Sequence, residues 1–239
     1  LPLGVLVGAT AGWIGYMIQQ SLENALRKAG SDRPVTTIIT QVIVDPDDPA
    51  LRDPSKFIGH SIPEDRARAL IAEGQTVRED SNGMFRRVVG SPAPIGIHDL
   101  PIIRPLIESG TIVIACGGGG VPVYMDPEKG LEGVDAIVDK DAAAAALARG
   151  LGAELLMILT NVDGVFANWG KPDQKKLSSL TIAEARELDE RGAFGEGSMA
   201  PKVRAAIQFA EATGGRAVIA ELKHGMEAVR GRAGTTLGG

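Results

Sequence analysis

The stretch from Thr111 to Val165 decides the fold, because it repeats a short apolar run followed by a polar or glycine-rich segment. It opens with Thr111-Ile-Val-Ile-Ala115, long enough for one buried strand, and continues with Cys116-Gly-Gly-Gly-Gly120. An alanine-rich run to Gly150 then predicts a helix, and Leu155-Leu-Met-Ile-Leu-Thr160 predicts a second strand. The order strand, glycine turn, helix, strand predicts an α/β fold with parallel strands.

Three polar clusters lie at the ends of these predicted elements. The first is the glycine run, the second is Val138-Asp-Lys140-Asp141 before the helix, and the third is Asn161-Val-Asp163 after the second strand. Ligands of parallel sheets bind beyond the carboxyl ends of the strands, and helix amino ends favour anions. We therefore expect a functional site built from these clusters.

Composition narrows the class of protein. With 239 residues, the chain is long enough for one large α/β domain or for two lobes. A formal net charge of -5 gives no case for binding nucleic acid or an anionic membrane. No apolar run approaches the roughly 20 residues of a membrane span. A single cysteine cannot form an internal disulfide and no signal-peptide pattern begins the sequence, so we expect a cytoplasmic protein.

Histidine and cysteine give little support for a metal site or a covalent mechanism. His60, His98 and His224 lie far apart without ligand spacing, which argues against zinc. Cys116 is expected to be a small buried side chain beside a turn, and the alternative is a nucleophile.

The sequence on either side of the central stretch predicts further regular elements. Apolar residues at every fourth position predict a helix over Gly12 to Ala29, and Val35 to Val44 has the composition of a strand. A further helix is predicted around Ile102 to Ile107, and a loop at Asn168 to Pro172. The capping box Thr181 to Glu184 begins a helix that extends to about Glu190, and another helix begins near Met199 with Val203, Ile207 and Ala210 facing inward. The last predicted strands are Arg216 to Ala220 and Gly234 to Leu237.

The segment from Asp45 to Ile97 is expected to be an insertion outside the core. Its first part, as far as Ser61, holds several prolines and aspartates and predicts a loop, and Ser61 is a candidate cap for a helix that begins at Pro63. Thr76 to Val89 predicts a hairpin that turns at Ser81-Asn-Gly83. We expect this insertion to be a mobile flap.

Two lysines occupy unusual positions at helix amino ends. Lys140 directly precedes one predicted helix, and Lys202 lies in the first turn of another. A helix amino end carries partial positive charge, so a lysine there is unfavourable by roughly 0.3–1 kcal/mol unless an anion joins it. The pair indicates a phosphate site, with Asp141 holding Lys140 or capping its helix. The alternative is that both lysines extend into water.

The four glycines allow backbone N–H groups to approach a ligand closely and allow positive φ angles. The alternative is a tight turn with no ligand. The run is neither a Walker A motif nor a dinucleotide fingerprint, so alone it is weak evidence.

Nine stretches, distributed along nearly the whole chain, resemble in sequence and in order the motifs of a known family. They are Thr40-Gln-Val-Ile-Val-Asp-Pro46, Lys56-Phe-Ile-Gly59, Arg87-Val-Val-Gly-Ser-Pro92, Pro94-Ile-Gly-Ile-His98, Ala115-Cys-Gly-Gly-Gly-Gly-Val-Pro-Val123, Val138-Asp-Lys-Asp141, Leu159-Thr-Asn-Val-Asp163, Asn168-Trp-Gly-Lys-Pro-Asp173 and Gly197-Ser-Met-Ala-Pro-Lys202. Together they resemble the carbamate kinases, a branch of the amino acid kinase family. The cysteine–glycine run, the last stretch and the insertion are specific to that branch.

The resemblance implies a three-layer αβα sandwich with a central, mainly parallel sheet. It implies reversible phosphoryl transfer between ATP and carbamate, giving ADP and carbamoyl phosphate, in arginine and carbamoyl-phosphate catabolism. It places the remainder of a carbamate and carbamoyl-phosphate lobe at 1–130, with a flap at about 45–97, and a nucleotide-binding lobe at 131–239. It also implies a homodimer, and Mg²⁺ held mainly through the nucleotide phosphates with no protein metal site.

The resemblance also assigns roles to single residues. Lys140 and Lys202 match lysines at the transferring phosphoryl group, and Asp141 matches the aspartate that organises them. Lys56 matches a lysine on the mobile flap. The residues expected to bind the nucleotide are Thr160, Asp163, Trp169, Lys171, Met199, Gly117 and Gly118.

The sequence departs from the family pattern at its beginning. The family starts with a strand ending in Gly-Gly-Asn and a loop of the type His-Gly-Asn-Gly-Pro, and Leu1 aligns after both. Roughly two βα units, on the order of 60 residues, are therefore not matched. Gly4, Ala11 and Ala93 also replace polar or charged residues of the pattern. We expect this chain to bind adenine nucleotide but to turn over carbamoyl phosphate poorly.

Two alternatives remain open at this point. One is a non-catalytic nucleotide-binding fragment or a subunit that depends on a partner. The other is a different member of the amino acid kinase family, against which the long insertion argues.

Overall fold

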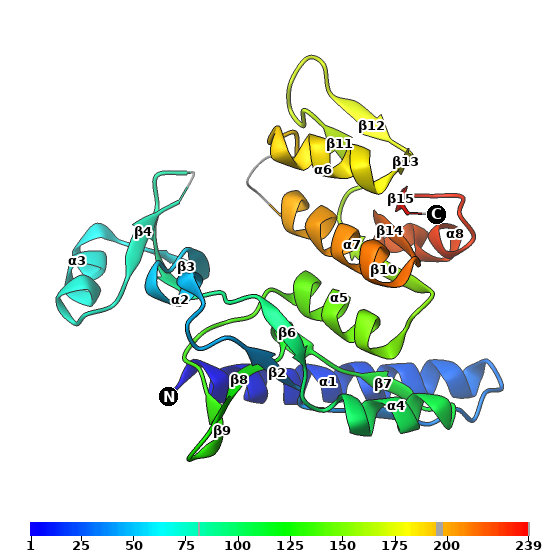
Figure 1. Cartoon of the computed structure of the whole chain (residues 1–239), viewed down its shortest axis with the longest axis horizontal. Coiled ribbons are helices and arrows are strands. Elements are labelled where there is room, and N and C mark those ends of the chain that lie inside the picture. The colour runs from blue at the N-terminus through cyan, green and yellow to red at the C-terminus, as the bar shows by residue number, and fades with distance from the viewer. Residues whose placement is uncertain (81, 195–197, 239) are drawn as a thin grey trace. The chain divides into compact units, whose positions relative to one another are not determined.

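The computed structural model describes residues 1–80, 82–194 and 198–238 and divides the chain into two compact units. Unit 1 contains residues 1–99 and 105–139, and unit 2 contains residues 100–104 and 140–239. Figure 1 shows helices and strands in both units, and each unit contains a parallel strand pair. The predicted α/β class with parallel strands is confirmed.

Unit 2 is built around a four-stranded sheet in the order β10-β14-β15-β13. These strands are β10 (Leu155–Thr160), β14 (Arg216–Glu221), β15 (Thr235–Leu237) and β13 (Ser179–Leu180). β10 and β14 run parallel, and on β14 alternate residues serve different cores. Ala217 and Ile219 pack into the main core, whereas Val218 and Ala220 pack with Ala228. A strand that is buried on both faces needs the continuous apolar run that the sequence shows.

The helices of unit 2 follow their local signals. They are α5 (Lys140–Leu151), α6 (Ile182–Glu190), α7 (Met199–Thr213) and α8 (Gly225–Val229). Thr181 and Glu184 form the predicted capping box, in which each side chain accepts a backbone N–H of the other residue. The inward face of α7 is confirmed, because Val203, Ile207 and Ala210 are buried. Two short strands, β11 (Val165–Ala167) and β12 (Lys175–Leu177), form a hairpin around the predicted loop.

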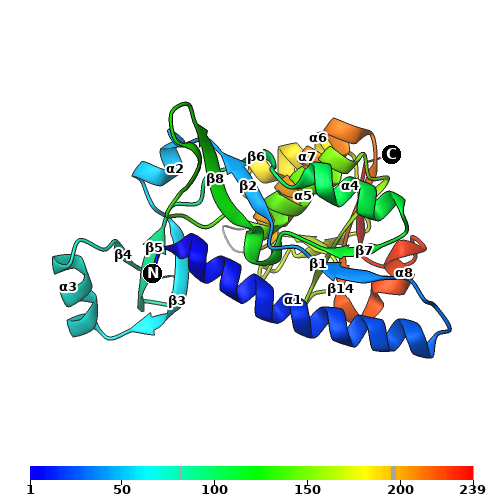
Figure 2. The same cartoon turned by 90° about the horizontal axis from the view of Figure 1, so that it is seen from below.

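In unit 1, the long helix α1 (Leu3–Lys28) runs beside the parallel pair β1 (Val35–Thr37) and β7 (Ile112–Ile114) (Figure 2). It begins nine residues before the predicted start at Gly12, so that boundary was wrong. Small residues explain the error, because they weaken the helical pattern but permit close packing. A Cβ on Gly4, within the part of the helix that was missed, would lie 3.2 Å from Cγ1 of Val121.

The single strand predicted over Val35 to Val44 is wrong. The structure has β1 and then β2 (Gln41–Val44), which belong to different sheets. Buried Thr40 lies between the two strands and interrupts the regular strand there. Its Oγ1 donates to the Ile38 carbonyl at 3.0 Å and accepts from the Cys116 N–H at 2.9 Å. A side chain that bonds to its own backbone competes with a strand ladder.

A four-stranded sheet in the order β6-β2-β8-β9 completes the main body of unit 1. Its other strands are β6 (Pro94–Ile97), β8 (Val121–Asp126) and β9 (Gly130–Gly133). The β8–β9 hairpin directly after the glycines was not predicted. Helix α4 (Leu100–Glu108), whose residues 100–104 belong to unit 2 and whose remainder belongs to unit 1, matches the helix expected before β7.

The insertion folds as a three-stranded sheet in the order β3-β5-β4, which we call the flap. Its elements are α2 (Pro49–Arg52), β3 (Lys56–Ile62), α3 (Glu64–Ala72), β4 (Val77–Glu79) and β5 (Phe85–Val89). The predicted hairpin is confirmed as β4–β5, although Ser81 at its turn lies outside the described residues.

Three expectations for the insertion were wrong. The loop predicted as far as Ser61 contains α2, which Asp48 caps, and most of β3. Ser61 itself lies in β3, and the N-cap of α3 is Pro63. The insertion ends before Pro94, because β6 pairs with β2 in the sheet of the main body.

Within residues 1–80, 82–194 and 198–238, no helix combines the length and the apolar character that crossing a membrane requires.

Candidate active site

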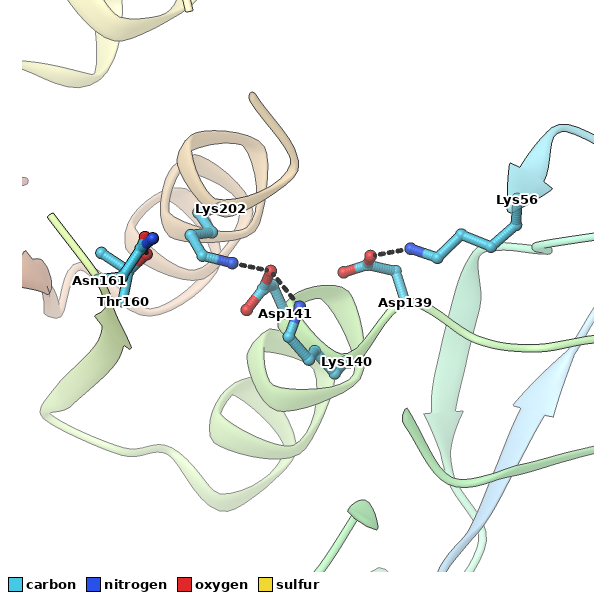
Figure 3. Close-up of polar contacts among 7 residues, drawn as sticks. All are labelled: Lys56, Asp139, Lys140, Asp141, Thr160, Asn161 and Lys202. Carbon is cyan, nitrogen blue, oxygen red and sulfur yellow. Dashed lines mark hydrogen bonds and ion pairs between the residues drawn. The ribbon is translucent and has the colours of Figure 1, made fainter. Parts of the chain in front are cut away.

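The amino ends of α5 and α7 bring three charged side chains together in unit 2 (Figure 3). Lys202 Nζ donates to Asp141 Oδ2 at 2.8 Å, and Lys140 Nζ lies 3.3 Å from the same oxygen. Lys140 and Asp141 open α5, and Lys202 is the fourth residue of α7. Gly197, which precedes α7 in the sequence pattern, lies outside the described residues. We call these three residues the Lys-Asp-Lys cluster.

Burial separates the roles of the two lysines. The side chains of Lys202 and Asp141 are only 7% and 8% exposed, whereas the Lys140 side chain is 64% exposed. A buried ammonium is stable only beside a partner, and Asp141 is that partner. The alternative that the lysine extends into water is therefore excluded for Lys202. The three side chains together carry a charge of about +1, so the cluster can accept an additional anion.

A pocket of about 410 Å³ lies in the same unit beyond the carboxyl end of β10. Its aromatic wall is Phe166 and Trp169, whose rings meet edge to face with centroids 5.0 Å apart. The residues that line it are Thr160, Asn161, Val162, Phe166, Asn168, Trp169, Lys171, Gly192, Ala193, Phe194, Ser198 and Met199. Its size, aromatic wall and few polar groups are those of a small-molecule site.

Four of the predicted nucleotide-binding residues line this pocket: Thr160, Trp169, Lys171 and Met199. Asp163 follows β10 and forms an ion pair with Lys176 at 2.5 Å. The hydrogen bond from the Lys176 ammonium holds the pKa of Asp163 below its usual range. Gly117 and Gly118 belong to unit 1, where they line a smaller, mainly apolar pocket beside α1.

Several of the residues that line the larger pocket were not predicted from the sequence. Asn161 and Phe166 flank predicted positions, and Phe194 reaches the pocket from the turn after α6. Asn168 adopts a left-handed conformation with φ of 55° and its amide donates to Asp173 at 2.7 Å. Asparagine tolerates that conformation better than most residues, so Asn168 directly before Trp169 was the available signal.

The flap lysine has a partner within unit 1. Lys56, the first residue of β3, donates from Nζ to Asp139 Oδ2 at 2.6 Å (Figure 3). Asp139 directly precedes Lys140 in the chain.

The glycine turn has the positive φ angles that its glycines allow. It forms a single 3₁₀ turn over Gly117–Gly119, with positive φ at Gly118, Gly119 and Gly120. Cys116 before it is buried and itself adopts φ of 55°. Burial raises the pKa of its thiol to about 11, so the thiolate is scarce at neutral pH. The structure supports the buried-filler interpretation of Cys116 over the nucleophile.

No group of three or more His, Cys, Asp or Glu side chains in the described part of the chain is arranged to hold a metal ion. Asp141, the buried carboxylate of the cluster, is instead bonded to two lysines.

Comparisons with known proteins show which family this chain is similar to. The sequence model of the amino acid kinase family matches residues 59–221. The chain is 49% identical to the carbamate kinase of Thermococcus kodakarensis, over 98% of this chain and 74% of that protein. It is 46% identical to the carbamate kinase of Halobacterium salinarum, over 99% of this chain and 75% of that protein. The chain thus spans about three quarters of each relative.

A solved structure shows the same fold. The structure of carbamate kinase from Giardia lamblia bound to AMP-PNP matches with a TM-score of 0.90 and 38% sequence identity. The match covers 100% of this chain and 76% of that one.

Proposed function

Because this chain belongs to the amino acid kinase family and, within it, to the carbamate kinases, we propose that it transfers a phosphoryl group reversibly between ATP and carbamate. In the direction of ATP synthesis, the bond between phosphorus and the carbamate oxygen of carbamoyl phosphate breaks. A bond forms between that phosphorus and a terminal oxygen of ADP. The observation that carries the proposal is the Lys-Asp-Lys cluster at two helix amino ends.

The cluster suits this reaction because phosphoryl transfer depends on positioning and charge neutralisation more than on covalent chemistry. Charge in the transition state is spread over the oxygens of the moving group, and fixed donors stabilise it best. Asp141 fixes the Lys202 ammonium at 2.8 Å, and the excess positive charge of the cluster remains available to the phosphoryl group. The amino ends of α5 and α7 add partial positive charge that favours an anion.

The nucleotide is proposed to occupy the pocket of about 410 Å³ in unit 2. The exposed face of Trp169 can stack on adenine, and Met199 supplies a second apolar contact. Lys171 and Thr160 offer a cation and a hydroxyl to phosphates or ribose. Asp163 follows β10, pairs with Lys176 and is not one of the residues that line the pocket. It is nevertheless proposed to contact the nucleoside.

Mg²⁺ is proposed to enter as part of the substrate, in complex with ADP or ATP. Mg²⁺ keeps several waters and commonly binds through phosphates with one or two carboxylates. The buried carboxylate nearest the proposed phosphoryl site, Asp141, is already bonded to Lys140 and Lys202. That arrangement favours a metal carried mainly by the phosphates.

Two groups of unit 1 are proposed to act on the phosphates as well. Lys56 would supply a further positive charge from the flap. The backbone N–H groups of Gly117 and Gly118 would donate to phosphate oxygens, since a turn with positive φ can form an anion-binding concavity.

The test is a coupled assay of ATP formation from ADP and carbamoyl phosphate. Lys202→Ala should lower the rate by at least roughly 10²–10³, because it removes a preorganised donor. Lys175→Ala, at an exposed position of β12 in the same unit, is the matched control and should keep the rate. Equal rates for both variants would refute the role of the cluster. Nucleotide binding without any ATP formation would favour the non-catalytic alternative.

We also propose a cytoplasmic homodimer. Several large apolar side chains on α1 are exposed in unit 1, and a second copy is the simplest partner for them; they are Val5, Leu6, Trp13, Tyr16 and Met17. Light scattering should give twice the chain mass, and Trp13→Glu should shift the protein towards the monomer. A monomeric parent protein would contradict the proposed homodimer.

The cytoplasmic location is proposed because the single, buried and unpaired cysteine suits a reducing compartment. Cell fractionation tests this location.

A further inference from the structure

The pair between Lys56 and Asp139 is electrostatically unlike the Lys-Asp-Lys cluster. In the cluster, one carboxylate serves two ammonium groups and the three side chains retain a charge of about +1. In the other pair, the Asp139 carboxylate lies 2.6 Å from the ammonium of the flap residue Lys56, and the charges of these two side chains cancel. A neutralised lysine attracts a phosphoryl group weakly, because the carboxylate beside it repels the same anion. Lys56 can therefore serve as a phosphoryl ligand only after it leaves Asp139.

The surroundings of this pair permit such an exchange. The side chain of Lys56 is 37% exposed and that of Asp139 is 20% exposed, so a ligand in solvent can reach the ammonium. Lysine carries its charge on a flexible four-carbon stem, so the ammonium can change partner without movement of the backbone.

A second connection between the same two segments does not depend on Lys56. The Ile137 N–H donates to the Gly90 carbonyl at 3.0 Å, which ties the stretch before Asp139 to the base of the flap just after β5. Lys56 itself pairs in register with Val89 at that base. Breaking the ion pair would therefore free the lysine and loosen β3 while the backbone attachment persists.

We propose that Asp139 is a positioning residue that holds Lys56 in a neutral resting pair, from which the phosphoryl group of the incoming substrate takes it. The identity of that anion rests on the proposed function, whereas the resting pair does not. A phosphoryl group offers more negative charge and more acceptor oxygens than one carboxylate, so it competes for the ammonium. Asp139 thus keeps the flap lysine ordered between turnovers, and lowers the apparent affinity for the substrate.

The first test measures the resting pair without any catalysis. Asp139→Asn keeps the size of the side chain and removes its charge, and Asp53→Asn is the control because Asp53 pairs with Arg78 in the same flap. Hydrogen exchange of β3 without ligand should become about fivefold faster in Asp139→Asn, as expected for losing one partly exposed ion pair. Lys56→Met should give the same increase, and the double variant should exceed neither. Exchange of β3 unchanged by Asp139→Asn would overturn the proposal.

The second test separates competition from simple stabilisation. Asp139→Asn should lower the KM for carbamoyl phosphate about three- to tenfold with kcat retained, because a larger fraction of the protein then has Lys56 available. In a Lys56→Met background, Asp139→Asn should leave KM unchanged. A similar fall in that background would show a general field effect and overturn the proposal. So would a fall in kcat at constant KM, which would make the pair part of the productive state.

The two tests also separate this proposal from the proposed function. If the parent protein forms no ATP, the proposed function fails, and titration with carbamoyl phosphate replaces KM as the measure of competition. Tighter binding by Asp139→Asn that requires Lys56 would then still support the resting pair, and unchanged binding would overturn it.

Discussion

Replacement of Asp141 by Asn should be the most damaging conservative change in unit 2. The side chain of Asp141 is 8% exposed and accepts a hydrogen bond from Lys202, whose side chain is 7% exposed. The substitution keeps the shape but removes the charge that neutralises a buried ammonium. Breaking a buried pair from one side is costly because the remaining charge is uncompensated.

The magnitude follows from two limits. Removing one partner of a buried ion pair typically costs about 3–5 kcal/mol. A lysine can instead lose its proton, which at pH 7 costs about 4.6 kcal/mol for an ordinary lysine, so the penalty has a ceiling near that value. The largely exposed Lys140 adds little. We expect a loss of about 3–4.5 kcal/mol in the free energy of unfolding, or roughly 6–18 °C in Tm for a chain of this size.

The assay is urea and thermal unfolding of Asp141→Asn, Lys202→Met and the double variant, followed by circular dichroism and tryptophan fluorescence. Lys202→Met should cost less than Asp141→Asn, because Asp141 keeps Lys140 as a partner. The double variant should be more stable than Asp141→Asn alone, since an apolar side chain replaces the unpaired charge. Glu187→Gln is the control: Glu187 pairs with Arg191 on the exposed face of α6, and its loss should cost less than about 1 kcal/mol.

Two results would refute this reasoning. One is a loss for Asp141→Asn as small as that of the control. The other is strict additivity of the two single changes, which would show that the buried ammonium does not depend on the carboxylate.

Three further predictions concern other parts of the chain. Trp169→Ala should weaken ATP binding about tenfold in calorimetry through lost stacking, and unchanged affinity would remove the nucleotide from this pocket. Native Cys116 should react with iodoacetamide at pH 8 at least roughly 10²-fold more slowly than in urea, because its raised pKa leaves little thiolate; equal rates would contradict its burial. Amides of the flap hairpin over residues 77–89 should exchange faster than those of β7, and equal protection would argue against a mobile flap.

Elements with a complete local signal were predictable from the sequence. The capping box at Thr181 specifies the start of α6 because both of its hydrogen bonds form within four residues. The apolar run at 155–160 specifies β10, and the inward face of α7 follows from the spacing of Val203 and Ile207. In each case, the physical cause lies within one turn or one strand of the residue that carries the signal.

Elements determined by distant contacts were not predictable in this way. The break between β1 and β2 depends on Thr40, whose hydroxyl accepts from Cys116, 76 residues away in the sequence. The early start of α1 includes Gly4 and Gly8, which a propensity argument counts as unfavourable for a helix but which fit against Val121 and Ile39. Phe194 joins the pocket because α6 returns the chain there. None of these partners is marked in the local sequence.

The consecutive residues Asp139, Lys140 and Asp141 show which partners in the candidate site the local sequence could not predict. The sequence presents two carboxylates around one lysine, and a role was predicted for Asp141 but none for Asp139. The structure places Asp139 in the irregular stretch before α5 and Asp141 in the first turn of that helix (Figure 3). The backbone becomes helical between the two residues, and Asp141 bonds to Lys202 whereas Asp139 bonds to Lys56. The helix boundary at Lys140 therefore gives one carboxylate to the buried cluster and the other to the flap.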